Sequence, residues 1–249
     1  MAKAGSKKRK IIICIVSIVA VIALLFGACA VYLGDYYHAI TPAVESFGLL
    51  DGSSLPETIK LDNGNIVCKS ENATKGLIFY PGGKVEYTAY LPLMESLAQK
   101  GILCVLVRMP FNLAVFDVNA ADGIREMFPE ITDWYIGGHS LGGSMAAAYL
   151  EKHPSDFKGL LLLAAYSTAD LSNENIRTLS IYGSNDGVLN REKYEQYRSN
   201  LPELTEYIID GGCHAYFGVY GSQDGDGTPT IDNARQINLT ADAVAKWVG

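Results

Sequence analysis

The 249-residue sequence is poor in histidine and cysteine, with four of the first and five of the second. No two cysteines have the Cys-x-x-Cys spacing of zinc and redox motifs, and the set is too sparse for a disulfide framework. Cys14 and Cys29 lie in a long apolar run, so only Cys68, Cys104 and Cys213 belong to the remainder. One disulfide among these three stays open, because an exported protein permits it.

The sequence also lacks an excess of basic residues beyond its first ten positions. Residues 1–10 hold five of the 20 basic residues and no acid, so the remainder carries 15 basic and 27 acidic side chains. An acidic body of this kind argues against nucleic acid as a partner.

No charged residue occurs between Ile11 and Gly34. As one helix, such a run spans the roughly 30 Å hydrocarbon core of a bilayer, so we expect a transmembrane anchor at residues 11–34 that binds the lipid bilayer. The basic cluster at residues 1–10 should stay cytoplasmic, which places the chain from Asp35 onward outside the cell membrane.

Two other interpretations of this run export the domain as well. The first is a cleaved signal peptide, although its apolar region usually covers only about 7–15 residues. The second is a lipoprotein signal that ends at Cys29, although Phe26 and the continued apolar run disfavour it.

Residues 35–56 are predicted to link the anchor to a domain at residues 57–249. Within that domain, short apolar runs alternate with segments of helical spacing, and this alternation predicts an α/β fold whose mostly parallel sheet has helices on both faces. Helices are expected near residues 88–100, 114–127, 142–152, 192–198 and 234–248. A hairpin is expected around Asp62-Asn63-Gly64, with further strands near residues 76–80, 102–107, 134–138, 159–166, 177–183 and 204–210.

The segment Gly138-His139-Ser140-Leu141-Gly142 matches the pattern G-x-S-x-G, after an apolar strand and at the start of a helix of small residues. In that context a sharp strand-to-helix turn exposes the serine oxygen. Ser140 is therefore the candidate nucleophile. A helix-capping serine in an ordinary turn is the alternative.

A serine hydroxyl needs a base to take its proton. Of the four histidines, only His214 follows a late strand, and it lies in a glycine-rich loop. His38 lies beside the apolar run, His139 precedes the serine, and His153 is placed as a helix C-terminal cap. His214 is the candidate base.

The acid that orients the base should follow the strand before that loop, which selects Asp186. Asp170 is the second choice and Asp210 the third.

Acyl transfer also requires a pair of N–H groups that stabilise the developing oxyanion. Leu141 supplies one because it follows the nucleophile, and Gly83 is chosen for the other, with Lys84 close behind.

These residues resemble the α/β-hydrolase superfamily, and more narrowly a small lidless family, "α/β-hydrolase fold 5", related to dienelactone hydrolases. The resemblance covers about residues 57–249 and implies Ser140, Asp186 and His214 as a catalytic triad. Cys213 departs from it, since a polar residue such as Asn is expected there. The likeness rests on FYPGGKVE, RMPFNLAVFD, IGGHSLGG, LLAAYS, SIYGSNDGV and GGCHAYFGVYGSQDGDGTPTI.

Residues 215–233 form a long segment directly after the base, and such loops are usually functional or disordered. Asp224 and Asp226 suggest calcium, but the remaining ligand spacing is missing. We expect a substrate-facing loop, with no metal and no cofactor.

The sequence thus predicts a membrane-anchored, extracytoplasmic serine hydrolase that cleaves a carboxylic ester of a small molecule. The alternatives are a dienelactone-hydrolase-like or thioester hydrolase, and a non-catalytic binding protein on the same fold.

Overall fold

The computed structural model describes residues 3–41 and 56–249. Contacts divide the chain into two compact units, Met1–Tyr36 and Tyr37–Gly249. Most of the linker predicted at residues 35–56 lies outside the described residues.

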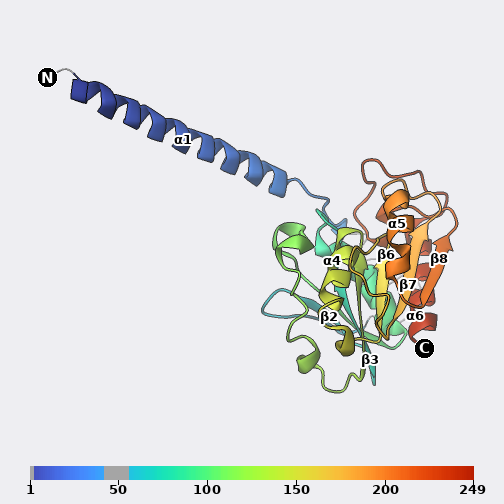
Figure 1. Ribbon diagram of the computed structural model, residues 1–249. Coiled ribbons are helices and arrows are strands. Elements are labelled where there is room, and N and C mark those ends of the chain that lie inside the picture. The colour runs from blue at the N-terminus through green and yellow to red at the C-terminus, as the bar shows by residue number, and fades with distance from the viewer. Residues whose placement is uncertain (1–2, 42–55) are drawn as a thin grey trace. The chain divides into compact units, whose positions relative to one another are not determined.

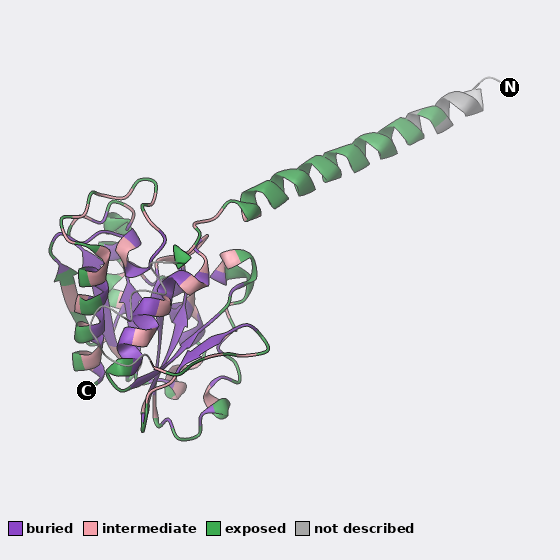
Figure 2. Cartoon of the chain, turned by 180° about the vertical axis from the view of Figure 1, so that it is seen from behind, coloured by how far each residue is buried: buried purple, intermediate pink, exposed green. Residues whose placement is uncertain are grey.

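The first unit contains one helix, α1 (Lys3–Gly34), which runs without interruption through the uncharged segment. From Ile12 onward its side chains are largely exposed, as the green ribbon in Figure 2 shows. Ile12–Gly34 is the one helix in the described part of the chain with the length and composition to cross a membrane, and a signal sequence near an N-terminus has the same properties.

The second unit is built on one eight-stranded sheet in the order β1-β2-β4-β3-β5-β6-β7-β8 (Figure 1). The first two strands form the expected hairpin, β2 pairs antiparallel with β4, and the other neighbours are parallel. The strands are β1 (Thr58–Lys60), β2 (Ile66–Cys68), β3 (Lys75–Tyr80), β4 (Ile102–Leu106), β5 (Asp133–His139), β6 (Gly159–Leu163), β7 (Arg177–Gly183) and β8 (Leu204–Ile209).

Helices cover both faces of the sheet, because alternate residues of its buried strands are apolar on either side. On β3, Leu77 and Phe79 belong to one core cluster, while Ile78 and Tyr80 belong to the other. The first cluster includes residues of α3 (Leu91–Gln99) and α6 (Asn233–Val248), and the second includes residues of α4 (Leu141–Leu150). A shorter helix, α5 (Arg191–Tyr197), connects β7 to β8.

The prediction of a helix at residues 114–127 is wrong. The segment contains only two 3₁₀ turns, η3 (Ala114–Phe116) and η4 (Arg125–Met127), after a third, η2 (Pro110–Asn112). Asp117, Asn119 and Asp122 favour turns because their short polar side chains compete for backbone hydrogen bonds. Gly123 adopts a φ of 75°, which ends any helix there.

The parallel arrangement brings four loops to the carboxyl edge of the sheet. They follow β3, β5, β7 and β8, and they carry Gly83, Ser140, Asp186 and His214. In the doubly wound folds, this edge is where ligands bind.

The cysteines of the described residues are all free thiols. Cys68 on β2 lies directly opposite Cys104 on β4. Both are buried.

Candidate active site

Ser140 occupies a sharp turn between β5 and α4, with φ 51° and ψ −122°. A non-glycine residue with positive φ is uncommon, and this one persists because the strand and the helix on either side fix the turn. The Ser140 N–H donates to the Leu163 carbonyl on the neighbouring strand at 2.9 Å. The turn therefore has the strained geometry of a nucleophile elbow, and the side chain is only partly buried.

Glycines flank the serine because the loop after β3 passes against the turn. A Cβ on Gly142 would lie 2.2 Å from the Pro81 carbonyl oxygen, and one on Gly138 would lie 2.4 Å from the Tyr80 oxygen. Both contacts are with backbone, which cannot rotate away. The spacing of glycines in the motif is thus required by this close approach.

His214 and Asp186 form a buried pair. The Nδ1 atom of His214 lies 3.0 Å from Oδ2 and 3.2 Å from Oδ1 of Asp186. Their side chains are 1% and 0% exposed. Asp186 Oδ1 also accepts the N–H groups of Val188 and Leu189, at 2.9 and 2.8 Å, so the carboxylate is fixed in the turn after β7. This arrangement leaves Nε2 as the ring nitrogen able to act on a substrate or a nucleophile.

The Nε2 atom of His214 is buried and has no hydrogen-bond partner among the described residues. Nε2 forms no hydrogen bond with Ser140. Hydrogen bonds between catalytic groups are often long in enzymes without substrate. The ring of His139, the residue before the serine, lies 4.5 Å from the His214 ring, centroid to centroid. Burial and the neighbouring His214 hold the pKa of His139 well below its ordinary value, so His139 is neutral.

The two other candidate acids have hydrogen-bond partners other than His214. Asp170 is exposed and binds the hydroxyl and N–H of Ser172 at 2.6 and 3.1 Å, and these bonds lower its pKa. Asp210 accepts a long hydrogen bond, 3.4 Å, from the Ser184 hydroxyl. Of the three aspartates, Asp186 is the one that contacts the histidine.

The predicted oxyanion donors are neighbours in space. A Cβ on Gly83 would lie 2.8 Å from Cδ2 and 3.2 Å from Cβ of Leu141. The N–H groups of Gly83 and Leu141 have no acceptor among the residues that the structure describes. Lys84, the second choice, donates its N–H to the Asn112 carbonyl at 2.8 Å and is thereby committed.

Tyr90 connects this loop to the elbow. Its hydroxyl accepts the Gly82 N–H at 3.1 Å and lies 2.8 Å from Nδ1 of His139. The loop after β3 is therefore held at a fixed distance from the turn that carries the serine.

Cys213, the residue before the base, faces the core. Burial, and then the charge of Asp226, raises the pKa of its thiol to about 12, so it is protonated at neutral pH and is not a nucleophile. Its N–H and carbonyl bind the amide of Gln236 on α6, at 3.0 and 2.8 Å. Gln236 on α6 thus fixes the backbone of the loop that carries His214.

Asp226 is a site residue whose role sequence reasoning missed. Its Oδ1 accepts the N–H groups of His214 and Gly187, each at 3.1 Å, and its Oδ2 accepts that of Ala215 at 2.8 Å. Burial acts to raise the pKa of Asp226, but the N–H groups of Ala215, His214 and Gly187 outweigh it and hold the pKa below its ordinary value. Because both carboxylate oxygens of Asp226 accept backbone N–H groups, they are not oriented to act as calcium ligands.

The repeated Asp-Gly pattern was the available signal for Asp226, since glycine permits the close backbone approach that such a contact needs. A Cβ on Gly187 would lie 2.5 Å from the Gly225 carbonyl oxygen. The loop after the base and the loop of the acid therefore pack backbone against backbone.

Known proteins resemble this chain in sequence and in fold. Residues 76–238 match the alpha/beta hydrolase family, and this region contains all four loops of the site. The chain belongs to the α/β hydrolase family. A proline iminopeptidase from Thermoplasma volcanium is 26% identical over 125 residues, which make up 45% of this chain and 42% of that protein. The match thus spans less than half the length of this relative.

Solved structures of α/β hydrolases share the fold at low sequence identity. An esterase from the archaeon Pyrobaculum calidifontis has a TM-score of 0.58 and 14% identity, over 83% of this chain and 91% of that one. A dienelactone hydrolase from Anabaena variabilis has a TM-score of 0.56 and 15% identity, over 78% and 97%. Est1E from Butyrivibrio proteoclasticus has a TM-score of 0.54 and 14% identity, over 78% and 98%. These likenesses establish the fold.

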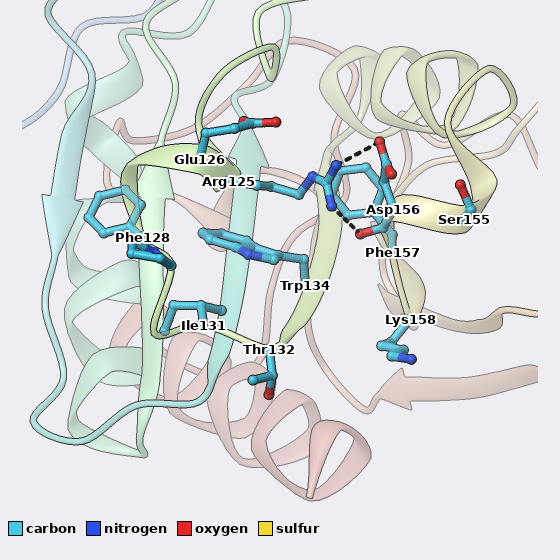
Figure 3. A pocket seen from close by; sticks show the side chains of 11 residues that line it. Arg125, Glu126, Phe128, Ile131, Thr132, Trp134, Ser155, Asp156, Phe157 and Lys158 are labelled. Atoms are coloured by element: carbon cyan, nitrogen blue, oxygen red, sulfur yellow. Dashed lines mark hydrogen bonds and ion pairs between the residues drawn. The ribbon is translucent and has the colours of Figure 1, made fainter.

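This α/β hydrolase also has a cavity of about 320 Å³, lined by residues that include Arg125 and Trp134 (Figure 3). Its lining includes the amino end of β5, whereas Ser140 follows the carboxyl end of that strand. Arg125 crosses it and binds the Asp156 carboxylate at 2.8 Å and the Asp156 carbonyl oxygen at 3.2 Å, the dashed lines in the figure. Its guanidinium also lies 5.6 Å from the Phe157 ring centroid. The cation is thus already neutralised, and the cavity is not the candidate active site.

Proposed function

We propose that the protein is a serine hydrolase that cleaves a carboxylic ester of a small molecule through an acyl-enzyme. Ser140 is the nucleophile, His214 the base and Asp186 the orienting acid. The observation that carries the proposal is the buried Asp186–His214 pair, whose Nε2 has no partner among the described residues. Its histidine ring packs against His139, the residue before the serine of a strained strand-to-helix turn.

In this mechanism Ser140 Oγ attacks the ester carbonyl while Nε2 of His214 takes the hydroxyl proton. Asp186 holds the imidazole in the tautomer with a proton on Nδ1 and stabilises the imidazolium. The N–H groups of Gly83 and Leu141 stabilise the oxyanion, which is usually the largest single catalytic contribution. His214 then protonates the leaving alcohol, and water hydrolyses the acyl-enzyme by the same steps.

Esters are favoured as substrates because esterases are among the proteins that share the fold. The thioester and dienelactone alternatives use the same nucleophile. They differ in the leaving group and the pocket.

We further propose that residues 11–34 anchor the chain in the membrane, with residues 1–10 cytoplasmic and the catalytic domain outside. The support is the uninterrupted apolar helix after five basic residues.

The proposal is tested by labelling the full-length chain in detergent with a fluorophosphonate probe, which reacts with an activated serine. Wild-type protein should be labelled and Ser140→Ala should not. The control is Ser144→Ala, one turn along the same helix, whose hydroxyl donates to the Tyr166 carbonyl instead. A wild-type chain that neither reacts nor hydrolyses a series of p-nitrophenyl esters would contradict the proposal and favour the non-catalytic alternative.

A further inference from the structure

Residues 37–40 precede the region that matches the family, yet they bond directly to the loop after β3. Tyr37 donates its N–H to the Lys84 carbonyl and accepts the Glu86 N–H, each at 2.8 Å, and pairs with Val85 as an isolated parallel bridge. The Ala39 N–H donates to a Glu86 carboxylate oxygen at 3.0 Å. These contacts begin one residue after the candidate oxyanion donor Gly83.

The same segment bonds to the loop after the base. The Tyr37 hydroxyl accepts the Asp224 N–H at 3.1 Å, and its ring lies 5.7 Å from that of Tyr220, centroid to centroid. The Ile40 N–H donates to the Val219 carbonyl at 2.9 Å. Asp224 is two residues from Asp226, whose carboxylate binds the His214 backbone.

The loop after β3 requires such support because its own backbone is strained. Lys84 has a φ of 59°, an uncommon conformation for a long side chain. Strain of this kind persists only where the surroundings fix the conformation. The surrounding hydrogen bonds come from Asn112 on one side of the Lys84 peptide and from Tyr37 on the other.

We propose that Tyr37 is a positioning residue: its main chain pairs with the loop after β3, and its side chain fixes that pairing to the loop after the candidate base through Tyr220 and Asp224. The segment at residues 37–40 is therefore a working part of the hydrolase site. This inference rests on the proposed function.

The oxyanion forms only in the transition state, so a displaced Gly83 N–H weakens transition-state binding more than substrate binding. Loss of Tyr37 should consequently lower kcat and leave KM nearly unchanged. If the segment only added stability, Tyr37→Ala would lower the unfolding temperature without this selective effect on kcat.

The test compares Tyr37→Ala and Tyr37→Phe in the full-length chain in detergent. Tyr37→Ala and Ile40→Ala both retain the backbone bonds of the segment. Tyr37→Ala removes the ring contact with Tyr220 and the hydroxyl contact with Asp224. Ile40→Ala is the matched control, because Ile40 lies in the same segment, is 45% exposed and takes no part in those two contacts. We expect Tyr37→Ala to lower kcat about tenfold or more with KM within twofold. Tyr37→Phe, which keeps the ring, should recover most of the loss, and Ile40→Ala should resemble wild type.

A second readout is inhibition by an alkyl trifluoromethyl ketone, which forms an oxyanion on the serine. Its affinity should fall in Tyr37→Ala by the same factor as kcat/KM. Unchanged kcat, or an equal loss in Ile40→Ala, overturns the inference.

Amide hydrogen exchange separates this inference from the proposed function. Residues 82–86 should exchange faster in Tyr37→Ala than in Ile40→Ala, whether or not any ester is hydrolysed. Should Tyr37→Ala fail to fold, Tyr37→Phe gives the same comparison through faster exchange at residues 223–225, where the hydroxyl contact is lost. Unchanged exchange in both segments overturns the inference, whereas absent labelling and turnover in wild type would overturn the proposed function alone.

Discussion

Asp226 accepts a hydrogen bond from the backbone N–H of His214 and so holds the base by its main chain. The same carboxylate binds Gly187, the residue after the candidate acid Asp186. One side chain thereby sets the distance between the two loops that supply the acid and the base. In the proposed mechanism the Asp186–His214 contact orients the base for proton transfer, and Asp226 holds the two loops in the position where that contact forms.

Asp226→Asn should therefore lower kcat although Asp226 has no place in the proton path. The substitution puts an NH₂ group against backbone donors, so one loop must move, and a displacement near 1 Å costs about 100-fold in rate. We expect kcat to fall about 10- to 100-fold with little change in KM. Asp224→Asn is the control, because within residues 3–41 and 56–249 the Asp224 side chain makes no hydrogen bond that supports these loops. Equal kinetics for the two variants would contradict the assignment.

The stability contributed by Asp226 should depend on pH. Its pKa is lower in the folded chain than in the unfolded chain, so the contribution is complete above the ordinary aspartate pKa, near 3.9. It is lost as the pH falls through the lower, folded value. The difference in unfolding free energy between wild type and Asp226→Asn should thus shrink between pH 6 and pH 3. Denaturant titrations at both pH values measure it, and a widening difference would give the wrong sign.

Replacing Asp186 tests the acid directly. Asp186→Asn should leave the fold intact and lower kcat by about 10⁴-fold, because the wrong imidazole tautomer becomes favoured. Asp170→Asn is the matched control, since Asp170 is exposed and bonds only within its own turn and to Glu151. A collapse in Asp170→Asn beside a nearly normal Asp186→Asn would overturn the assignment and leave Ser140 and His214 standing.

Gly142→Ala should destabilise the domain even though alanine favours helix by about 1 kcal/mol. The added Cβ meets the Pro81 and Tyr80 carbonyl oxygens at 2.2 and 2.3 Å, so the loop after β3 must shift. We expect a net loss of about 1–3 kcal/mol in unfolding free energy. Ala148→Gly on the same helix should cost about 1 kcal/mol by propensity alone. A stabilised Gly142→Ala would show that the two loops are not in close contact.

Carbonate extraction tests the anchor. The full-length chain should remain with the membrane pellet, since Ile12–Gly34 is long enough to cross it. Mass spectrometry of the extracted chain separates the alternatives: an intact N-terminus supports the anchor, a lipidated chain that begins at Cys29 supports a lipoprotein, and a shortened soluble chain supports a signal peptide.

The strands and the family were predictable from the sequence because their signals are local. The apolar run at Ile102–Leu106 predicts a strand that is buried on both faces, whatever its neighbours are, and the glycines around Ser140 indicate a tight turn. Chain order then placed an acid and a histidine after successive strands. The helix predicted at residues 114–127 was wrong for a related reason. Its prediction used only the local spacing of apolar residues and ignored the turn-forming aspartates and Gly123.

Contacts between distant loops were decided only by the tertiary structure. The Asp-Gly repeat around Asp226 permits a close backbone approach but does not specify that its partner is the backbone of His214. Nothing in the sequence near Tyr37 indicates a partner at Lys84. Such contacts join segments that are 12 and 47 residues apart, and they form only after the parallel strands bring their carboxyl ends to one edge. The sequence by itself indicated the candidate catalytic residues, while folding determined which residues hold them in place.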